Sequence, residues 1–160
     1  MNKKVTEKKD FKKIKENITE VEYKKLMSFV RGNETLRLNT KQNLLRTFTI
    51  LFFTGLRLNE VQELKIIDIK NLLENGNVKI DISKTSTQRK LYLTNSFQKE
   101  LLKLFDFKIE DDDNRIISKG SNKNKKTSIN KIVFIQQVNK TIKEILGEGF
   151  SSHSFRQGLI

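Results

Sequence analysis

Residues 54–65 read TGLRLNEVQELK and join two apolar helical runs. Gly55 fits the end of the first helix, because glycine adopts the left-handed conformation that closes helices without steric cost. Asn59, with Gln62 three residues later, resembles the cap of the next helix. Arg57 therefore falls in the elbow between the two helices. A guanidinium at this place serves either as half of a structural ion pair or as a fixed fork for an anionic ligand.

Helices are expected on both sides of this elbow. Thr19 and Glu22 have the spacing of a capping box, which predicts a first helix over residues 19–31. The apolar residues before the elbow follow the 3.6-residue period and predict a central, largely buried helix capped by Asn39 or Thr40. Later helices are expected from Asn95 or Ser96 through Phe105, over residues 129–146, and from Ser151 onward.

The segment after the elbow has the alternation and turn signals of strands. Strands are expected at residues 66–69, 78–83 and 89–93, with the tip of a hairpin at residues 84–88. Residues 110–128 are expected to be a surface loop around a short strand at residues 115–117. Together these elements predict an α+β fold that is mostly helical, with a small three-stranded antiparallel sheet.

The composition favours one domain. The chain has 160 residues, of which 36% are apolar, and this is enough for one compact core. Residues 1–17 contain seven lysines and no sustained apolar period, so they are expected to form a leader or linker. Residues 18–160 would form the domain.

The charge favours a polyanionic partner. Lys and Arg number 32 against 19 Asp and Glu, which gives a net charge of +13, and nucleic acid is the first candidate. The absence of cysteine and the single histidine argue against a thiolate or histidine-rich metal centre, and no cofactor is expected. No apolar run reaches the roughly 18 residues that a membrane span needs, so a cytoplasmic protein is expected.

Three motifs follow one another along the chain: TGLRLNE at residues 54–60, the predicted hairpin with Lys84, and HSFR at residues 153–156. They resemble the TGLR-x-x-E box, the lysine hairpin and the H-x-L-R box of the tyrosine recombinases, a family that includes phage integrases and chromosome dimer resolvases. Their order and spacing also match. The resemblance covers about residues 19–160 and implies a mostly helical catalytic domain with a small antiparallel sheet.

The resemblance implies a site that holds a DNA phosphate between Arg57, Lys84, His153 and Arg156. The two arginines would stabilise the charge that gathers on the non-bridging oxygens during attack. His153 would donate a hydrogen bond or move a proton, and Lys84 would protonate the leaving 5′ oxygen. Glu60 would orient Arg57.

Simpler interpretations remain for these residues. Arg57 would pin the elbow by pairing with a carboxylate such as that of Glu60, His153 would merely begin a helix, and Lys84 would be an exposed turn lysine. Other basic residues are candidates for contacts to the DNA backbone, or else are solvated charges. They are Lys79, Arg89, Lys90, Lys123, Lys125 and Lys126.

The tyrosines depart from the family pattern. The nucleophilic tyrosine of the family lies several tens of residues beyond the H-x-L-R box, whereas this chain ends at Ile160. Tyr23 and Tyr92 fall in the first helix and the return strand, so neither matches the place of the nucleophile. Gln157 stands where many members have a second histidine. A catalytic domain truncated before its nucleophile is therefore expected.

Three functions remain open. The first is a fragment of a site-specific recombinase that cuts and rejoins double-stranded DNA through a covalent 3′-phosphotyrosyl intermediate. The second is a non-catalytic DNA-binding module that retains the phosphate clamp, and a basic RNA-binding helical domain is a weaker third. The full-length parent would be a tetramer on paired DNA sites, and the fragment alone an inactive monomer.

Overall fold

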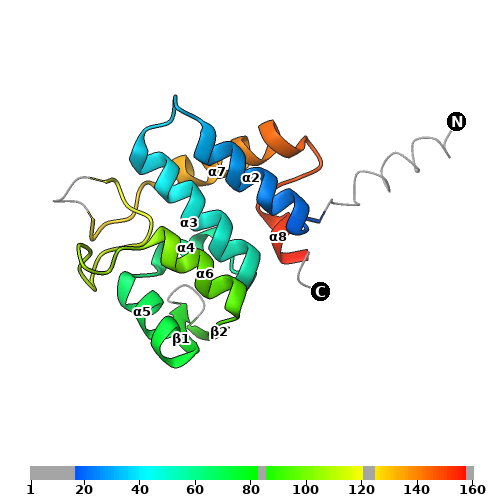
Figure 1. The fold of residues 1–160 in the computed structure, drawn as a ribbon. Helices are drawn as coiled ribbons and strands as arrows, with labels where there is room; N and C mark the ends of the chain where they lie inside the picture. The colour runs from blue at the N-terminus through cyan, green and yellow to red at the C-terminus, as the bar shows by residue number, and fades with distance from the viewer. Residues whose placement is uncertain (1–16, 83–85, 121–124, 158–160) are drawn as a thin grey trace, which may run out of the picture.

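The computed structural model describes residues 17–82, 86–120 and 125–157, with the backbone alone for Arg156 and Gln157. Figure 1 shows the arrangement of its helices and strands. In chain order they are α2 (Glu20–Gly32), α3 (Leu38–Thr54), α4 (Leu58–Glu63), α5 (Ile66–Asn75), β1 (Asn77–Ile82), β2 (Thr87–Tyr92), α6 (Asn95–Leu104), α7 (Lys131–Leu146) and α8 (His153–Gln157).

Helix α3 is the centre of the fold. It contacts α2, α4, α6 and α8, and it runs through the middle of the molecule (Figure 1). Phe48, Ile50 and Leu51 of α3 are completely buried. The prediction of a central, buried helix before the elbow is therefore confirmed. Gly55 ends this helix as expected, with a φ of 70° and its N–H donated to the carbonyl of Leu51 at 3.0 Å.

The sheet differs from the prediction, because the described residues contain two strands and not three. Strands β1 and β2 pair antiparallel, from Asn77 opposite Tyr92 to Ile82 opposite Thr87, which confirms the hairpin. The third expected strand, at residues 66–69, is instead the first turn of α5. The Asp68 carboxylate accepts the Lys65 N–H at 2.9 Å and caps this helix.

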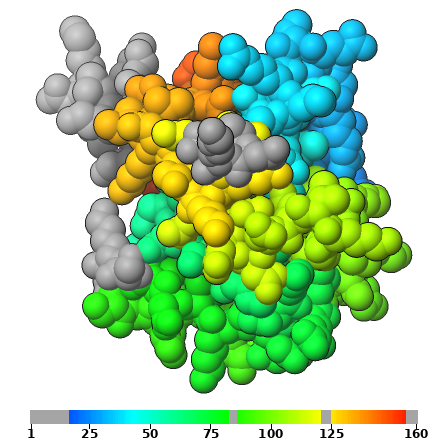
Figure 2. All heavy atoms as spheres, turned by 90° about the vertical axis from the view of Figure 1, so that its left-hand side faces the viewer, coloured from blue at the N-terminus to red at the C-terminus, as the bar shows by residue number. Residues whose placement is uncertain are grey.

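Residues 115–117 do not form a strand either. Arg115 makes only an isolated bridge with Lys65, and the chain then lies against α3. The side-chain amide of Asn43 holds it there, donating to the carbonyl of Ser118 at 2.8 Å and accepting the Ser118 N–H at 3.3 Å. Residues 110–128 are thus not wholly a surface loop, because Ile116 and Ile117 are completely buried. The yellow atoms of this region that reach the surface in Figure 2 lie between the cyan start of α3 and the green segment that contains α5.

Several helix starts differ from the predictions by one to three residues. Helix α3 begins after Arg37 rather than at Asn39 or Thr40, and α6 is capped by the hydroxyl of Thr94, which accepts the Phe97 N–H at 3.2 Å. Helix α4 begins after Arg57 rather than at Asn59. The capping box of Thr19 is confirmed, since the Thr19 N–H donates to Glu22 at 3.0 Å. None of the described helices is long and apolar enough to cross a membrane.

Candidate active site

Arg57 is the residue from which α4 begins, and a buried carboxylate fixes its backbone. Glu60 is only 4% exposed, and its Oε1 accepts the Arg57 backbone N–H at 2.8 Å. The same oxygen lies 4.0 Å from Nη2 of Arg89, on β2. Glu60 therefore holds the elbow through the main chain and also faces the hairpin.

The side chain of Arg57 is exposed. Within residues 17–82, 86–120 and 125–157, no hydrogen bond or ion pair engages its guanidinium. A structural ion pair with Glu60 was the simpler interpretation of this arginine. The geometry does not support that pairing, and it leaves the guanidinium available to a ligand.

Arg57 and His153 line the same cavity, which has a volume of about 160 Å³. Its walls come from the start of α4, the first turns of α7 and the start of α8. The other lining residues are Leu58, Asn59, Lys131, Ile135, Asn139 and Ser152. The cavity thus unites a residue of the first motif with a residue of the last one, and it adds a lysine that the sequence did not single out.

Helix α8 is held in place on the core side, so that its first residue faces outward. Phe155 is 1% exposed and stacks on Phe48 of α3, with ring centroids 6.0 Å apart. Upstream, the Ser152 N–H donates to Oδ1 of Asn139 on α7 at 2.9 Å. His153 itself is exposed. These anchors fix the position of His153 relative to Arg57.

Two other predicted catalytic residues are less completely described. Arg156 lies in α8 one turn after His153, and the structure gives only its backbone. Lys84 lies outside the described residues, between the strands β1 and β2.

The predicted DNA-contact residues fall into separate places. Lys79 and Lys90 are exposed and stand directly opposite each other across the hairpin, where two like charges are unfavourable without an anion nearby. Arg89 is half-buried and faces Glu60. Lys125 and Lys126 belong to the loop before α7, and Lys126 is exposed. Lys123 lies outside the described residues.

Sequence reasoning missed Lys131, Asn59 and Asn139, which line the cavity with Arg57. Lys131 is the first residue of α7, directly after Asn130, whose side chain caps the helix by accepting the Ile132 N–H at 2.9 Å. The sequence alone contains the pattern of a capping Asn130 followed by Lys131, which places a lysine at the start of the helix. The apolar period of that helix predicts only its buried face, which does not include Lys131.

No group of three His, Asp or Glu in the described part of the chain could hold a metal ion.

Comparisons with known proteins identify the family and the fold. The chain matches the model of the phage integrase family over residues 16–159. It is also similar to the crystal structure of XerA recombinase, with a TM-score of 0.62 and 17% sequence identity, over 88% of this chain and 46% of that one. The chain thus spans less than half the length of that recombinase, and at this identity the likeness shows the fold. No curated protein sequence matches the chain.

Proposed function

The chain belongs to the phage integrase family of tyrosine recombinases, and we propose that it is the larger part of the catalytic domain of a site-specific DNA recombinase. The observation that carries this proposal is the cavity shared by Arg57 and His153. An exposed guanidinium, an imidazole and the ammonium of Lys131 meet there, which suits a phosphodiester.

The proposed reaction exchanges one phosphoester bond for another. A tyrosine oxygen attacks the phosphorus, the bond to the 5′ oxygen breaks, and a 3′-phosphotyrosyl link forms. The leaving 5′ oxygen takes a proton, for which Lys84 is the proposed donor. The 5′ hydroxyl of a second strand then attacks the same phosphorus and releases the tyrosine, so that no outside energy source is needed.

The residues of this chain would stabilise the transition state and position the phosphate. Charge gathers on the non-bridging oxygens during attack, and a guanidinium such as that of Arg57, whose backbone is held by Glu60, would stabilise this charge. His153 would donate a hydrogen bond to one of these oxygens. Arg156, one turn after His153 in α8, is the proposed second arginine. The tyrosine nucleophile is proposed to lie beyond Ile160.

Neither tyrosine among the described residues lines the cavity of Arg57 and His153. Tyr23 is 3% exposed, with its hydroxyl oxygen 2.9 Å from Oγ1 of Thr49, and Tyr92 lies on the hairpin. Because no tyrosine of the described residues lines the cavity, a second candidate function is a DNA-binding module without catalysis. Such a module would bind duplex DNA in a salt-sensitive manner and would form no covalent adduct.

A suicide substrate separates the two functions. The protein expressed from its complete reading frame is incubated with a nicked duplex that loses its 5′ end after cleavage, and denaturing electrophoresis then detects protein attached to DNA. We expect a covalent adduct, strongly reduced by Arg57→Gln and by His153→Gln. Arg37→Gln is the matched control, because Arg37 is also an exposed arginine at a helix start. A reading frame without a tyrosine after Ile160, or a wild type without adduct, would refute the recombinase.

A further inference from the structure

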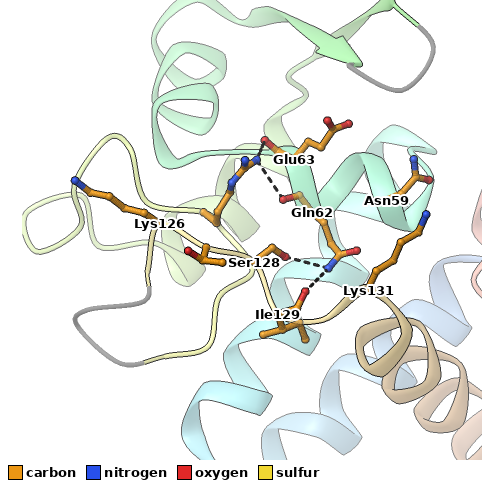
Figure 3. A pocket seen from close by; sticks show the side chains of 9 residues that line it. Asn59, Gln62, Glu63, Lys126, Ser128, Ile129 and Lys131 are labelled. Carbon is orange, nitrogen blue, oxygen red and sulfur yellow. Dashed lines mark hydrogen bonds between the residues drawn. The ribbon is translucent and has the colours of Figure 1, made fainter.

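A second and larger cavity, of about 560 Å³, lies beside the one already described, between the end of α4 and residues 126–131 (Figure 3). Three cationic side chains line it, those of Arg115, Lys126 and Lys131. The Glu63 carboxylate is the one acidic group among its lining residues. The charged groups on its wall are thus cationic in excess, which favours an anionic occupant.

Hydrogen bonds between the residues that line this cavity hold its walls together. Nε2 of Gln62 donates to Oγ of Ser128 and to the carbonyl of Ile129, both at 3.0 Å (Figure 3). Nη1 of Arg115 donates to the carbonyl of Glu63 at 2.6 Å. Helix α4 is therefore tied to the loop before α7 through Gln62, and to Arg115 through the carbonyl of Glu63. Among the described residues, only Nη1 of the Arg115 guanidinium has acceptors, the carbonyls of Glu63 and Gln62, so its other N–H groups have no partner in that part of the chain.

The two cavities share part of their walls. Asn59 and Lys131 belong to both of them, and Figure 3 shows the Lys131 side chain extended toward Asn59. A ligand that passes from the Arg57 cavity into the larger one therefore passes Lys131. A single small anion would occupy one cavity, whereas a strand with a repeating charge would occupy both.

We propose that the larger cavity is a second phosphate subsite, which takes the backbone phosphate next to the one held between Arg57 and His153 on the same DNA strand. This inference rests on the proposed function, because it assumes that a DNA strand occupies the first cavity. Lys126 serves the second phosphate alone. Lys131 stands between the two phosphates, and Arg115 provides the fixed donor at the far wall.

The first arm of the test is the salt dependence of duplex binding by the chain. A lysine that neutralises one phosphate contributes about 0.9 to the slope of log affinity against log salt concentration. We expect Lys126→Gln and Lys131→Gln each to lower the slope by about this amount. Lys140→Gln should leave it unchanged. Lys140 lies on the same helix α7 as Lys131, is highly exposed, and lines neither cavity.

The second arm identifies which phosphate each lysine contacts. A duplex series carries one neutral methylphosphonate at successive positions of the cleaved strand. The wild type should lose affinity at two neighbouring positions. For Lys126→Gln, a methylphosphonate at the second of these positions should cause no further loss of affinity. A methylphosphonate at the first position should weaken its binding as much as it weakens that of the wild type. Lys140→Gln should give the wild-type pattern.

The outcomes separate this inference from the function on which it rests. If Lys126→Gln and Lys131→Gln lose as much affinity as the wild type at every methylphosphonate, the subsite is refuted and the recombinase is untouched. If inorganic phosphate binds to the larger cavity while neither lysine variant changes the affinity for duplex DNA, the site binds free anions, and the inference is also refuted. A wild type that binds no duplex DNA would refute both proposals.

Discussion

Arg57 and His153 line one cavity although the first begins α4 and the second begins α8, near the opposite end of the described chain. Helix α3 is the reason, because α4 and α8 both pack on it. Gly55 turns the chain from α3 into α4, and the stack of Phe155 on Phe48 holds α8 against α3. The relative positions of Arg57 and His153 therefore depend on the central helix.

Glu60 is expected to matter for both stability and cleavage. Glu60→Ala removes the acceptor of the Arg57 N–H, and a lost helix cap costs about 0.5–2 kcal/mol. Urea unfolding should show this loss in the free energy of unfolding, and the yield of covalent DNA adduct should fall because Arg57 is no longer fixed. Glu60→Gln keeps an oxygen acceptor and should lose less of both. An alanine variant with wild-type stability would show that the elbow needs no cap.

Removal of one partner from the buried ion pair of Arg46 and Glu110 is expected to be strongly destabilising. Their side chains are 3% and 8% exposed, with Nη2 and Oε1 3.3 Å apart. Burial lowers the pKa of Arg46 and the charge of Glu110 raises it. Glu110→Ala leaves the guanidinium buried without its anion, which typically costs about 3–5 kcal/mol.

The matched control for this prediction is Asp112→Ala. It removes the partner of Lys70 in an ion pair whose side chains are 51% and 35% exposed, and such pairs contribute about 1 kcal/mol or less. Urea unfolding measures both variants. Equal losses in the two variants would contradict a special role for the buried pair.

Asp68 should make stability depend on pH. Burial raises the pKa of its carboxyl group, against the hydrogen bond from the Lys65 N–H. The folded protein then binds the Asp68 proton more tightly than the unfolded chain does. This stabilising contribution is complete below the unfolded pKa of about 3.9, and it is lost as pH rises through the folded pKa.

Asp68→Asn removes this titration and keeps an oxygen at the cap. The free energy of unfolding of the wild type, relative to the variant, should therefore fall between about pH 4 and about pH 7. Urea unfolding of both proteins at the two pH values gives the difference. A difference that is constant, or that rises with pH, would contradict the assignment.

Tyr23 is expected to be structural. Its ring stacks on Phe52 with centroids 4.3 Å apart, its hydroxyl lies 2.9 Å from Oγ1 of Thr49, and burial raises its pKa. Tyr23→Phe should lower the free energy of unfolding by about 0.5–1.5 kcal/mol. It should leave the yield of covalent adduct unchanged. A folded Tyr23→Phe protein that no longer forms the adduct would make Tyr23 the nucleophile.

The sequence predicted the helices better than the sheet. Ile66, Ile69 and Leu72 repeat every three residues and are all buried, yet the run Ile66–Ile69 alone is too short to distinguish a helix from a strand. The cap from Asp68 decides in favour of the helix. The start of α6 differs from the prediction because two neighbouring polar residues, Thr94 and Asn95, are both suitable caps. Helices α3 and α4 instead begin after arginines whose side chains do not cap them.

The candidate site was predicted only in part. Motifs identified Arg57 and His153, but no local pattern states that two distant residues share a cavity, since this depends on packing around α3. Lys131 was missed for the same reason. Its place in the cavity depends on how α7 packs beside α4, and the periodicity along α7 does not contain that information.

The most direct test of the account is a double-mutant cycle on Arg57 and His153. The dissociation constant of the chain for duplex DNA is measured for the wild type, Arg57→Gln, His153→Gln and the double variant. If both side chains hold one phosphate, the double variant should lose less than the sum of the single losses, with a coupling of about 0.5–3 kcal/mol. Losses that add within about 0.3–0.5 kcal/mol would show that the two residues act on separate groups, and would contradict the shared phosphate site.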